Sequence, residues 1–322
     1  AFGKNLAPST GGFQSTGFGN SGFGFQGNQQ QAQPAGQFFG AGAQNVSQQF
    51  QQFSSAYQSN KVAGMAISNK GEIELDQERE VFVPHSFTDT ISDIKIKESN
   101  MSYFVAVSSW DGNVQMFQLG GSGQSAKPSI QPICQPVQTG GPILGICFEA
   151  DPVQQMSQFN PAPQQKSMII YLAHSDGSIK RWDPTQQQMS PASIGQHSMP
   201  VKDVYSFATP QGVFLVSGGW DGIVKFFKIN GGMSTQIGES NVFKPVHYMS
   251  GQFPLLVTAH SEQFINIWNL DALNQTFNPV SVRESPLKYC TTAISCFGDG
   301  KGYAVGSIEG RCGIVHIRFE NV

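Results

Sequence analysis

The chain has 322 residues, and its 19 Lys and Arg against 22 Asp and Glu give a net charge of −3. Charged residues make up only 13% of the chain. This balance excludes binding to nucleic acid or membranes through bulk positive charge, so any basic surface has to be local. No apolar run is long enough for a transmembrane helix, and no signal peptide is visible.

Residues 1–60 differ sharply in composition from the rest of the chain. They contain 13 Gln, 11 Gly and 9 Phe, and Lys4 is their single charged residue. Gly and Gln bury too little apolar surface to offset the entropy of an ordered chain, so we expect this segment to be disordered.

Phenylalanine recurs along this segment, and four rings are followed by glycine, at Phe2, Phe18, Phe23 and Phe39. A ring on an uncharged chain can enter a small apolar pocket, and the adjacent glycine lets the backbone approach. Many weak contacts of this kind add up to avidity. The segment resembles the Phe-Gly repeats of nucleoporins, which implies contacts with nuclear transport receptors. The alternative is a Gln-rich linker that is prone to β-association and has no specific partner.

Residues 61–80 form the expected linker between this tail and a folded domain over residues 81–322. Their second half carries a run of charges that the tail lacks, at Glu72, Glu74, Asp76, Glu78, Arg79 and Glu80.

A strand–turn–strand unit recurs five times in the folded domain. Each unit has an apolar strand, a tight turn built on Asp-Gly or a variant, and a second strand with alternating apolar residues. The turn acids lie 65, 45, 41 and 47 residues apart, at Asp111, Asp176, Asp221, Glu262 and Glu309. Repeats of this length and content are typical of an all-β WD-repeat β-propeller with four-stranded blades.

The register within the units predicts which side chains are buried between blades. Three residues after each acid stand Val114, Ile179, Val224, Ile265 and Cys312, and six residues after it stand Phe117, Trp182, Phe227, Trp268 and Val315. Five further strands are predicted to precede the units, at 91–96, 143–148, 201–207, 242–249 and 293–297. His197 lies before the third unit, where a hydrogen bond to Asp221 is expected.

Five units fall short of the seven blades that are usual for a closed propeller of this type. We therefore expect a fragment that lacks about two C-terminal blades, and the start at Ala1 instead of Met agrees with this expectation. Residues 80–87 are predicted to be the N-terminal strand that completes the final blade. Residues 151–166, rich in Pro and Gln, are predicted to be a loop insertion.

The sequence offers few residues in the patterns that are typical of catalytic or metal-binding sites. His174, Ser175 and Asp176 are neighbours along the chain, whereas catalytic groups usually converge from separate segments, so we interpret them as blade structure. Nucleotide-binding and nucleophile-elbow motifs do not occur. The five cysteines have no pairing or zinc-ligand spacing, which predicts a reducing, intracellular compartment, with Cys147 and Cys296 buried as apolar side chains. We expect no enzyme activity and no cofactor.

Several irregular segments resemble one specific family. DTISDIKI, SSWDGNV, QHSMPVKDV, RESPLKY and GYAVGSIEGRCGI occur in the order and spacing of the Rae/Gle-type mRNA export factors of the nuclear pore. The mitotic checkpoint propeller is a sister of that family. The Phe-Gly tail favours the export factor, and the resemblance implies a location at the nuclear pore complex and nuclear envelope.

The resemblance also implies that the propeller binds a hairpin motif called GLEBS in a Phe-Gly nucleoporin. Arg311 is the first contact expected, because guanidinium groups bind carboxylates in a bidentate manner, and Lys288 and Glu309 follow. Glu309 has an alternative role as the turn acid of its own blade. Gln263 stands where the family usually carries Arg, which weakens the case for a basic contact on that blade.

Two alternative functions stay open at this point. One is a spindle checkpoint adaptor that binds kinases through a similar hairpin. The other is an RNA-binding propeller, with a local basic patch from Lys180, Arg181, Lys202, Lys225 and Lys228. The 18 basic and 22 acidic residues of 61–322 favour reading these five as solvated surface.

Overall fold

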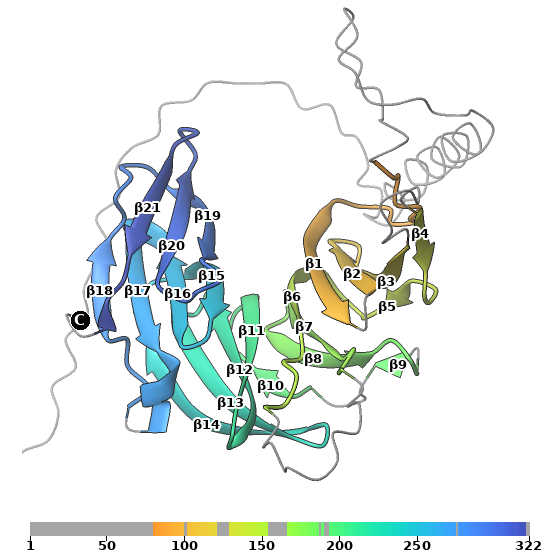
Figure 1. Cartoon of the computed structure of the whole chain (residues 1–322), viewed down its shortest axis with the longest axis horizontal. Coiled ribbons are helices and arrows are strands. Elements are labelled where there is room, and N and C mark those ends of the chain that lie inside the picture. The colour runs from red at the N-terminus through yellow and green to blue at the C-terminus, as the bar shows by residue number, and fades with distance from the viewer. Residues whose placement is uncertain are drawn as a thin grey trace, which may run out of the picture. The chain divides into compact units, whose positions relative to one another are not determined.

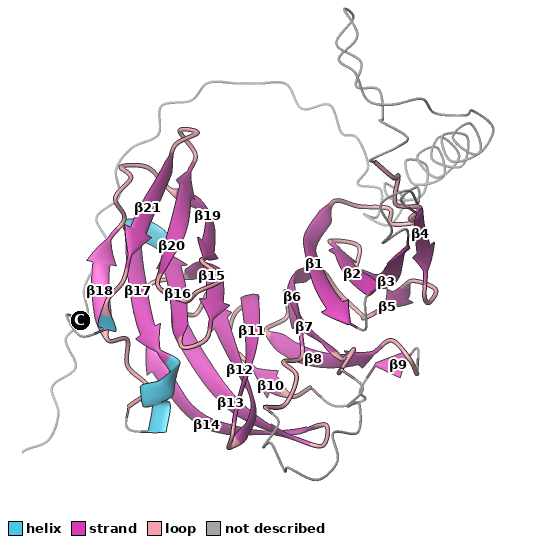
Figure 2. Ribbon diagram, viewed as in Figure 1, coloured by secondary structure: helices cyan, strands magenta, loops and turns pink. Residues whose placement is uncertain are grey.

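The computed structural model describes residues 80–99, 102–120, 129–153, 166–186, 188–189, 193–274 and 276–319. The predicted Phe-Gly segment, including Phe2, Phe18, Phe23 and Phe39, lies outside the described residues, as do nearly all of the linker and most of the 151–166 insertion. The described part of the chain is built from β-strands with short 3-10 turns, among them η1 (Ser261–Gln263) and η2 (Leu270–Asn274) (Figure 2).

Five antiparallel sheets follow one another along the chain (Figure 1), and we number them as blades 1 to 5. Blade 1 contains β1 (Ile91–Ser99), β2 (Ser102–Ser109), β3 (Asn113–Gly120) and β4 (Ser129–Pro132), with β5 (Val137–Gln138) also paired to β3. Blade 2 contains β6 (Ile143–Phe148), β7 (Ile170–His174), β8 (Ser178–Asp183), β9 (Gln188–Met189) and β10 (Gly195–Gln196).

The remaining three blades repeat this meander. Blade 3 contains β11 (Val201–Thr209), β12 (Gly212–Gly219), β13 (Ile223–Asn230) and β14 (Met233–Asn241). Blade 4 contains β15 (Val246–Gln252), β16 (Leu255–His260), β17 (Phe264–Asn269) and β18 (Ser281–Glu284). Blade 5 contains β19 (Thr291–Cys296), β20 (Gly302–Ser307) and β21 (Cys312–His316). The prediction of an all-β propeller with five blades is confirmed.

The first strands of the blades run side by side in one direction. The third residue of β1, Asp93, accepts a hydrogen bond from the N–H of Ile146, the fourth residue of β6. Asp203, the third residue of β11, does the same for Met249, the fourth residue of β15. Further along, Lys97 of β1 binds the Glu149 carbonyl just after β6, and bonds from Ala150 to Ser206 and from Cys296 to Ser250 connect the other neighbouring first strands near their ends. All first strands therefore begin on the same side of the propeller.

Each first strand also carries a β-bulge after its first residue, so that the third residue resumes the pairing, as between Ile91 and Asp93 or Val201 and Asp203. A bulge increases the local twist and re-aims the following side chain. In blades 1 and 3 the re-aimed side chain is the aspartate that reaches the next blade.

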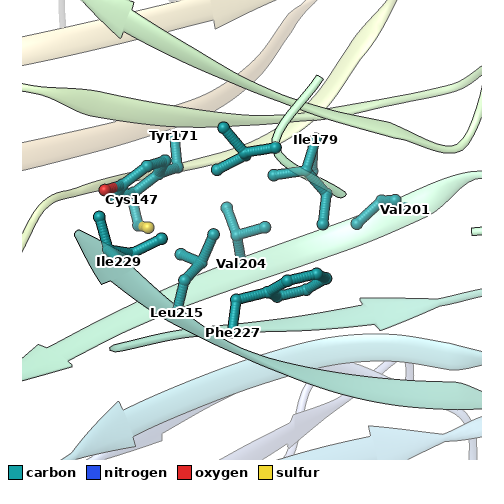
Figure 3. Packing of buried hydrophobic residues seen from close by; sticks show 10 residues of the cluster. Cys147, Tyr171, Ile179, Val201, Val204, Leu215, Phe227 and Ile229 are labelled. Carbon is teal, nitrogen blue, oxygen red and sulfur yellow. The ribbon is translucent and has the colours of Figure 1, made fainter. Parts of the chain in front are cut away.

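The hydrophobic core is divided into layers between consecutive blades. Figure 3 shows the layer between blades 2 and 3, where Cys147, Tyr171 and Ile179 pack against Leu215 and Phe227. The predicted inward positions are confirmed in the first four blades, because each side chain three or six residues after the turn acid is at most 2% exposed. In blade 5 the prediction is wrong for Cys312, which is exposed, and Val315 is only half-buried. The core cluster that blade 5 shares with blade 4 instead buries Tyr303 and Val305 of β20.

Three local expectations need correction. Residues 80–87 form no strand, and Phe87 instead packs against β2 and β3 of blade 1. The strand expected at 242–249 begins only at Val246, because Phe243 has a positive φ of 61° and Pro245 has no N–H to pair. Cys147 is buried as expected, but Cys296 is half-buried, and the five cysteines are all free.

Candidate functional site

The same hydrogen bond closes one end of every blade. The residue before each turn acid donates its N–H to the carbonyl of the residue just before the first strand, as from Trp220 to Pro200 (2.9 Å) and from Ile308 to Cys290 (3.1 Å). Since all first strands begin on the same side, these loops and turns gather there. We call this surface the turn face: the loops that precede the first strands and the turns that contain the five acids.

The turn itself is built from the acid and the residue that follows it. In blades 1 to 3 the aspartate accepts the N–H two residues later, as Asp111 does from Asn113 (2.9 Å). The following residue has positive φ in all five blades, and it is glycine except in blade 4, where Gln263 has φ 68°. Glu262 of that blade also has positive φ and binds Lys244 Nζ at 2.6 Å.

Two of the predicted partner residues meet on the turn face of blade 5. Arg311 Nε lies 3.5 Å from Glu309 Oε2, and the arginine side chain is 76% exposed while that of Glu309 is 20% exposed. Ser307 Oγ also binds Glu309 at 3.3 Å. Glu309 is thus tied into its own turn, whereas most of the Arg311 side chain is open to solvent.

Lys288 lies in the neighbouring loop between β18 and β19, two residues from Cys290, and Cys290 is bonded to the same turn through Ile308. The structure therefore places all three predicted residues on the turn face of blade 5.

Sequence reasoning missed a set of exposed apolar side chains on the turn face. They lie in the loops and turns of several blades, and their exposed fractions run from 43% to 81%, for Trp110, Met199, Phe243, Tyr289 and Ile308. The signal was present in the repeat alignment, where Trp110, Trp220 and Ile308 stand directly before the turn acid. Exposed apolar side chains that gather on one surface are typical of a protein-binding site, and Tyr289 and Ile308 share their loop and turn with Lys288 and Arg311.

A buried polar triad lies beneath the turn face in blade 3. As predicted, His197 Nδ1 contacts both carboxylate oxygens of Asp221 at 3.0 Å, and its Nε2 contacts Ser217 Oγ at 2.7 Å. The same three residue types serve nucleophilic catalysis in hydrolases. Ser217 is fully buried, however, and His197 is only 2% exposed, so no substrate can reach the hydroxyl. The triad ties the loop before β11 to strand β12.

Burial and hydrogen bonding set the charge states of this triad. Burial lowers the pKa of His197, and the Asp221 carboxylate only partly offsets this. Burial opposes the ionised form of Asp221, but hydrogen bonds from His197, Ile223 and Ser198 hold the pKa of its carboxyl below the usual value. At neutral pH the pair is therefore a neutral imidazole that donates to a carboxylate.

Blade 4 has a second buried arrangement with a different order. Trp268 Nε1 donates to Thr258 Oγ1 (3.1 Å), and Thr258 Oγ1 contacts His260 Nε2 (2.8 Å). The other ring nitrogen of His260 contacts the Lys244 carbonyl at 3.2 Å, and burial lowers the pKa of His260 to about 4.

The sequential group His174, Ser175 and Asp176 does not form a convergent site. Asp176 Oδ1 is occupied by the N–H and hydroxyl of Ser178, at 2.8 and 2.6 Å. His174 is 1% exposed, and burial lowers its pKa to about 4.

Most of the predicted basic patch is engaged in bonds within the propeller. Lys180, Lys202 and Lys225 donate to the backbone carbonyls of Thr139, Leu144 and Gln196, at 2.7, 3.3 and 2.8 Å. Arg181 lies with its Nε buried and its guanidinium group near Gly232. Lys228 is near the far end of β13, away from the turn face. The five side chains are thus spread over different parts of blades 2 and 3.

Within the described ranges, no three His, Cys, Asp or Glu side chains gather as they would around a metal ion. No helix in this part of the chain is long and apolar enough to span a membrane.

Comparisons with known proteins agree with the repeat and the fold. The family model "WD domain, G-beta repeat" matches residues 190–228, the segment that contains the His197 loop and blade 3 up to Lys228. A crystal structure of the computationally designed Ika8 protein is similar with a TM-score of 0.51 and 16% identity, and covers 77% of this chain and 63% of that one. At that identity the likeness shows the fold alone.

The similar curated proteins include export factors and checkpoint proteins. The Poly(A)+ RNA export protein of Schizosaccharomyces pombe is 29% identical over 76% of this chain and 62% of its own length. The mRNA export factor GLE2 of Chaetomium thermophilum is 27% identical over 71% and 57%. The mitotic checkpoint protein BUB3.1 of Arabidopsis thaliana is 31% identical over 72% and 59%. The chain thus spans about 60% of the length of these relatives, and the predicted resemblance to the export factors is confirmed.

Proposed function

We propose that this chain, a WD-repeat propeller similar to the Rae1/Gle2 mRNA export factors, is a non-enzymatic adaptor in the export of mRNA–protein particles at the nuclear pore. The observation that carries the proposal is the sequence similarity of 71% to 76% of this chain to proteins named for RNA export. The expected location is the nucleus and its envelope.

The turn face of blade 5 is the proposed docking site for a GLEBS-type hairpin of a Phe-Gly nucleoporin. Arg311 can donate two parallel hydrogen bonds to a carboxylate of the hairpin while Glu309 holds the guanidinium in place. Lys288 adds a second cation from the adjacent loop, and the exposed rings and aliphatic side chains of Tyr289 and Ile308 offer apolar contact next to both. An acidic hairpin with one apolar anchor fits this arrangement.

The Phe-Gly pairs at Phe2, Phe18, Phe23 and Phe39 are the proposed contacts for nuclear transport receptors. The test is their replacement by serine in the full chain, which should abolish receptor capture while hairpin binding is kept. Unchanged receptor capture would show that the four rings are incidental.

Two rival functions are distinguished by direct binding. In a pull-down with the full chain, the nucleoporin hairpin should be captured in preference to the hairpin of a checkpoint kinase, and exclusive kinase capture would replace the export function by a checkpoint function. RNA binding through Lys180, Arg181, Lys202, Lys225 and Lys228 predicts an affinity that falls steeply with salt. The engagement of three of these ammonium groups by backbone carbonyls speaks against that rival.

The contact residues are tested by charge reversal. Arg311→Glu should weaken hairpin binding tenfold or more, which is about 1.4 kcal/mol or more. Arg318→Glu is the matched control, because Arg318 is exposed two residues after β21 ends, away from the turn of Arg311. Equal affinity of the two variants would remove Arg311 from the site.

A further inference from the structure

We infer that the groove between blades 3 and 4, on the side opposite the turn face, binds a Phe-Gly segment of a partner polypeptide. This goes beyond the proposed function, in which the hairpin binds the turn face and the chain's own Phe-Gly pairs bind receptors. The cavity has a volume of about 490 Å³, within the usual range of ligand pockets, about 300–1,000 Å³.

The groove lies on the opposite side because of the strand directions. Its lining includes Thr209, Pro210 and Gln211 of the β11–β12 hairpin and the start of η2 after β17. Strand β11 begins at the turn face and ends at this hairpin, and β17 likewise runs away from the turn at Glu262. A ligand in the groove therefore leaves the turn face free.

Aromatic rings form the floor of the groove. The ring centroids of Phe207 and Phe214, which both line the groove, lie 5.3 Å apart with nearly parallel planes. The ring of Phe277, which also lines the groove, lies 5.3 Å from the buried ring of Phe226. All four lining residues Phe207, Leu270, Phe214 and Phe277 are apolar; the first two are 3% exposed and the last two are half-buried. A further aromatic ring that packs on this floor makes offset-stacked or edge-to-face contacts, which stabilise it in addition to the burial of its apolar surface.

The packing of β14 fixes the position of the Phe277 ring. A Cβ atom at Gly238 would lie 2.3 Å from Cδ2 of Phe277, so the absence of a side chain at this place in β14 makes room for the ring. The floor is therefore a consequence of blade packing and is present before any ligand arrives.

Two opposite charges stand at the rim. Lys228 of β13 and Asp271 of η2 line the groove, and within the described part of the chain neither side chain has a hydrogen-bond or ion-pair partner. An ammonium group can bind a peptide carbonyl and a carboxylate can bind a peptide N–H. Because the two charges cancel, the rim favours a neutral backbone over an acidic or basic peptide. A phenylalanine flanked by glycine in a charge-free segment has this chemistry.

The experiment locates the peptide by photocrosslinking to the full chain. The probe is a synthetic peptide with the sequence GFGNSGFGF, identical to residues 17–25, in which the ring at Phe23 is replaced by benzoylphenylalanine. We expect crosslinks in the segments 207–214 and 270–277. Crosslinks confined to the turn face, or none at all, would overturn the inference.

The contribution of the charged rim to peptide binding is tested with two variants of the chain. Lys228→Glu should lower the crosslink yield about tenfold, the effect of losing one hydrogen bond to a charged donor. Lys301→Glu is the matched control, since Lys301 is exposed beside the equivalent hairpin of blade 5. Both variants carry surface changes, and their unfolding curves should match that of the parent.

The role of the aromatic floor is tested by changing the peptide ligand. The unlabelled peptide with all three Phe replaced by Leu should compete about threefold to tenfold less well than the Phe peptide, because aliphatic side chains lose the ring–ring contacts. In Phe214→Leu this preference should shrink. Equal competition by both peptides, or equal yields for Lys228→Glu and Lys301→Glu, would show that the groove is not a site for phenylalanine.

Discussion

Blades 3 and 4 both connect their entering loop to their second strand through a buried histidine, but with different hydrogen-bond partners. In blade 3 the imidazole comes from the loop, at His197, and reaches in to Ser217, with Asp221 as its acceptor. In blade 4 it comes from the strand, at His260, and reaches out to the carbonyl of Lys244.

The difference lies in where the charge sits. Blade 3 keeps a nearly buried carboxylate, with the Asp221 side chain 5% exposed, whereas the equivalent Glu262 of blade 4 is 62% exposed and pairs with Lys244 in solvent. The turn acid is therefore part of the interior in one blade and part of the surface in the other, although the two repeats align residue by residue. This comparison leads to four predictions.

Removal of the turn acid should have the largest effect and should differ most between the two blades. Asp221→Ala leaves the His197 N–H and the N–H groups of Ser198 and Ile223 without their acceptor, which should cost about 3–5 kcal/mol of the free energy of unfolding. Glu262→Ala should cost less than about 1 kcal/mol, as is usual for exposed ion pairs. Urea unfolding at pH 7 measures both, and equal losses would contradict the assignment of the two acids.

The second prediction concerns acid sensitivity. Burial lowers the pKa of His260 to about 4, below its unfolded value of 6.5, so the folded state binds the proton less well. Stability from this histidine is present above pH 6.5 and is lost as the pH falls toward 4, by up to about 3 kcal/mol. His260→Gln should flatten the decline in the free energy of unfolding between pH 6.5 and 4. An unchanged slope would mean that His260 is not buried in its neutral form.

The third prediction has the opposite sign and concerns the first strands. Burial raises the pKa of Asp203 to about 6, above its unfolded value of 3.8, because the nearby Lys95 ammonium offsets this effect only partly and the Asp93 carboxylate adds to it. The folded state therefore binds this proton more tightly, and stability from Asp203 rises as the pH falls through 6. Asn can still accept from the Met249 N–H without the buried charge, so Asp203→Asn should gain about 1–2 kcal/mol at pH 8. The gain should vanish by pH 4; a loss at pH 8 would mean that the ionised carboxylate stabilises the fold.

The sequence was sufficient to predict what depends on periodicity and turn chemistry. The five turns, the buried positions after each acid in blades 1 to 4 and the bond from His197 to Asp221 all follow from spacing along one blade. The other partners of the two buried histidines could not be predicted, because Ser217, Thr258 and the Lys244 carbonyl are selected by how the strands and loops of each blade pack together. The repeats also did not indicate that Lys180, Lys202 and Lys225 bind neighbouring carbonyls. A lysine that points into solvent and one that binds a carbonyl have the same local sequence pattern.

The fourth prediction concerns the turn residue after the acid, for which exchanges in both directions can be compared. Gln263 holds a φ of 68° where the other four blades have glycine, and a left-handed conformation costs a residue with a Cβ about 1 kcal/mol. Gln263→Gly should remove this strain but also loosen the unfolded chain, so we expect a net gain below about 1 kcal/mol.

The reverse change in blade 3, Gly222→Gln, should lower the free energy of unfolding by more than Gln263→Gly raises it. Gly222 has a φ of 73°, and a Cβ there would lie 3.1 Å from the backbone nitrogen of Lys244 and 3.2 Å from the carbonyl carbon of Phe243. Gly222→Gln therefore adds a close contact with backbone to the strain in φ, and should cost about 1–3 kcal/mol in urea unfolding. If the two exchanges were equal and opposite, the turns would differ only in backbone strain, and the tighter packing around the turn of blade 3 would have no energetic consequence.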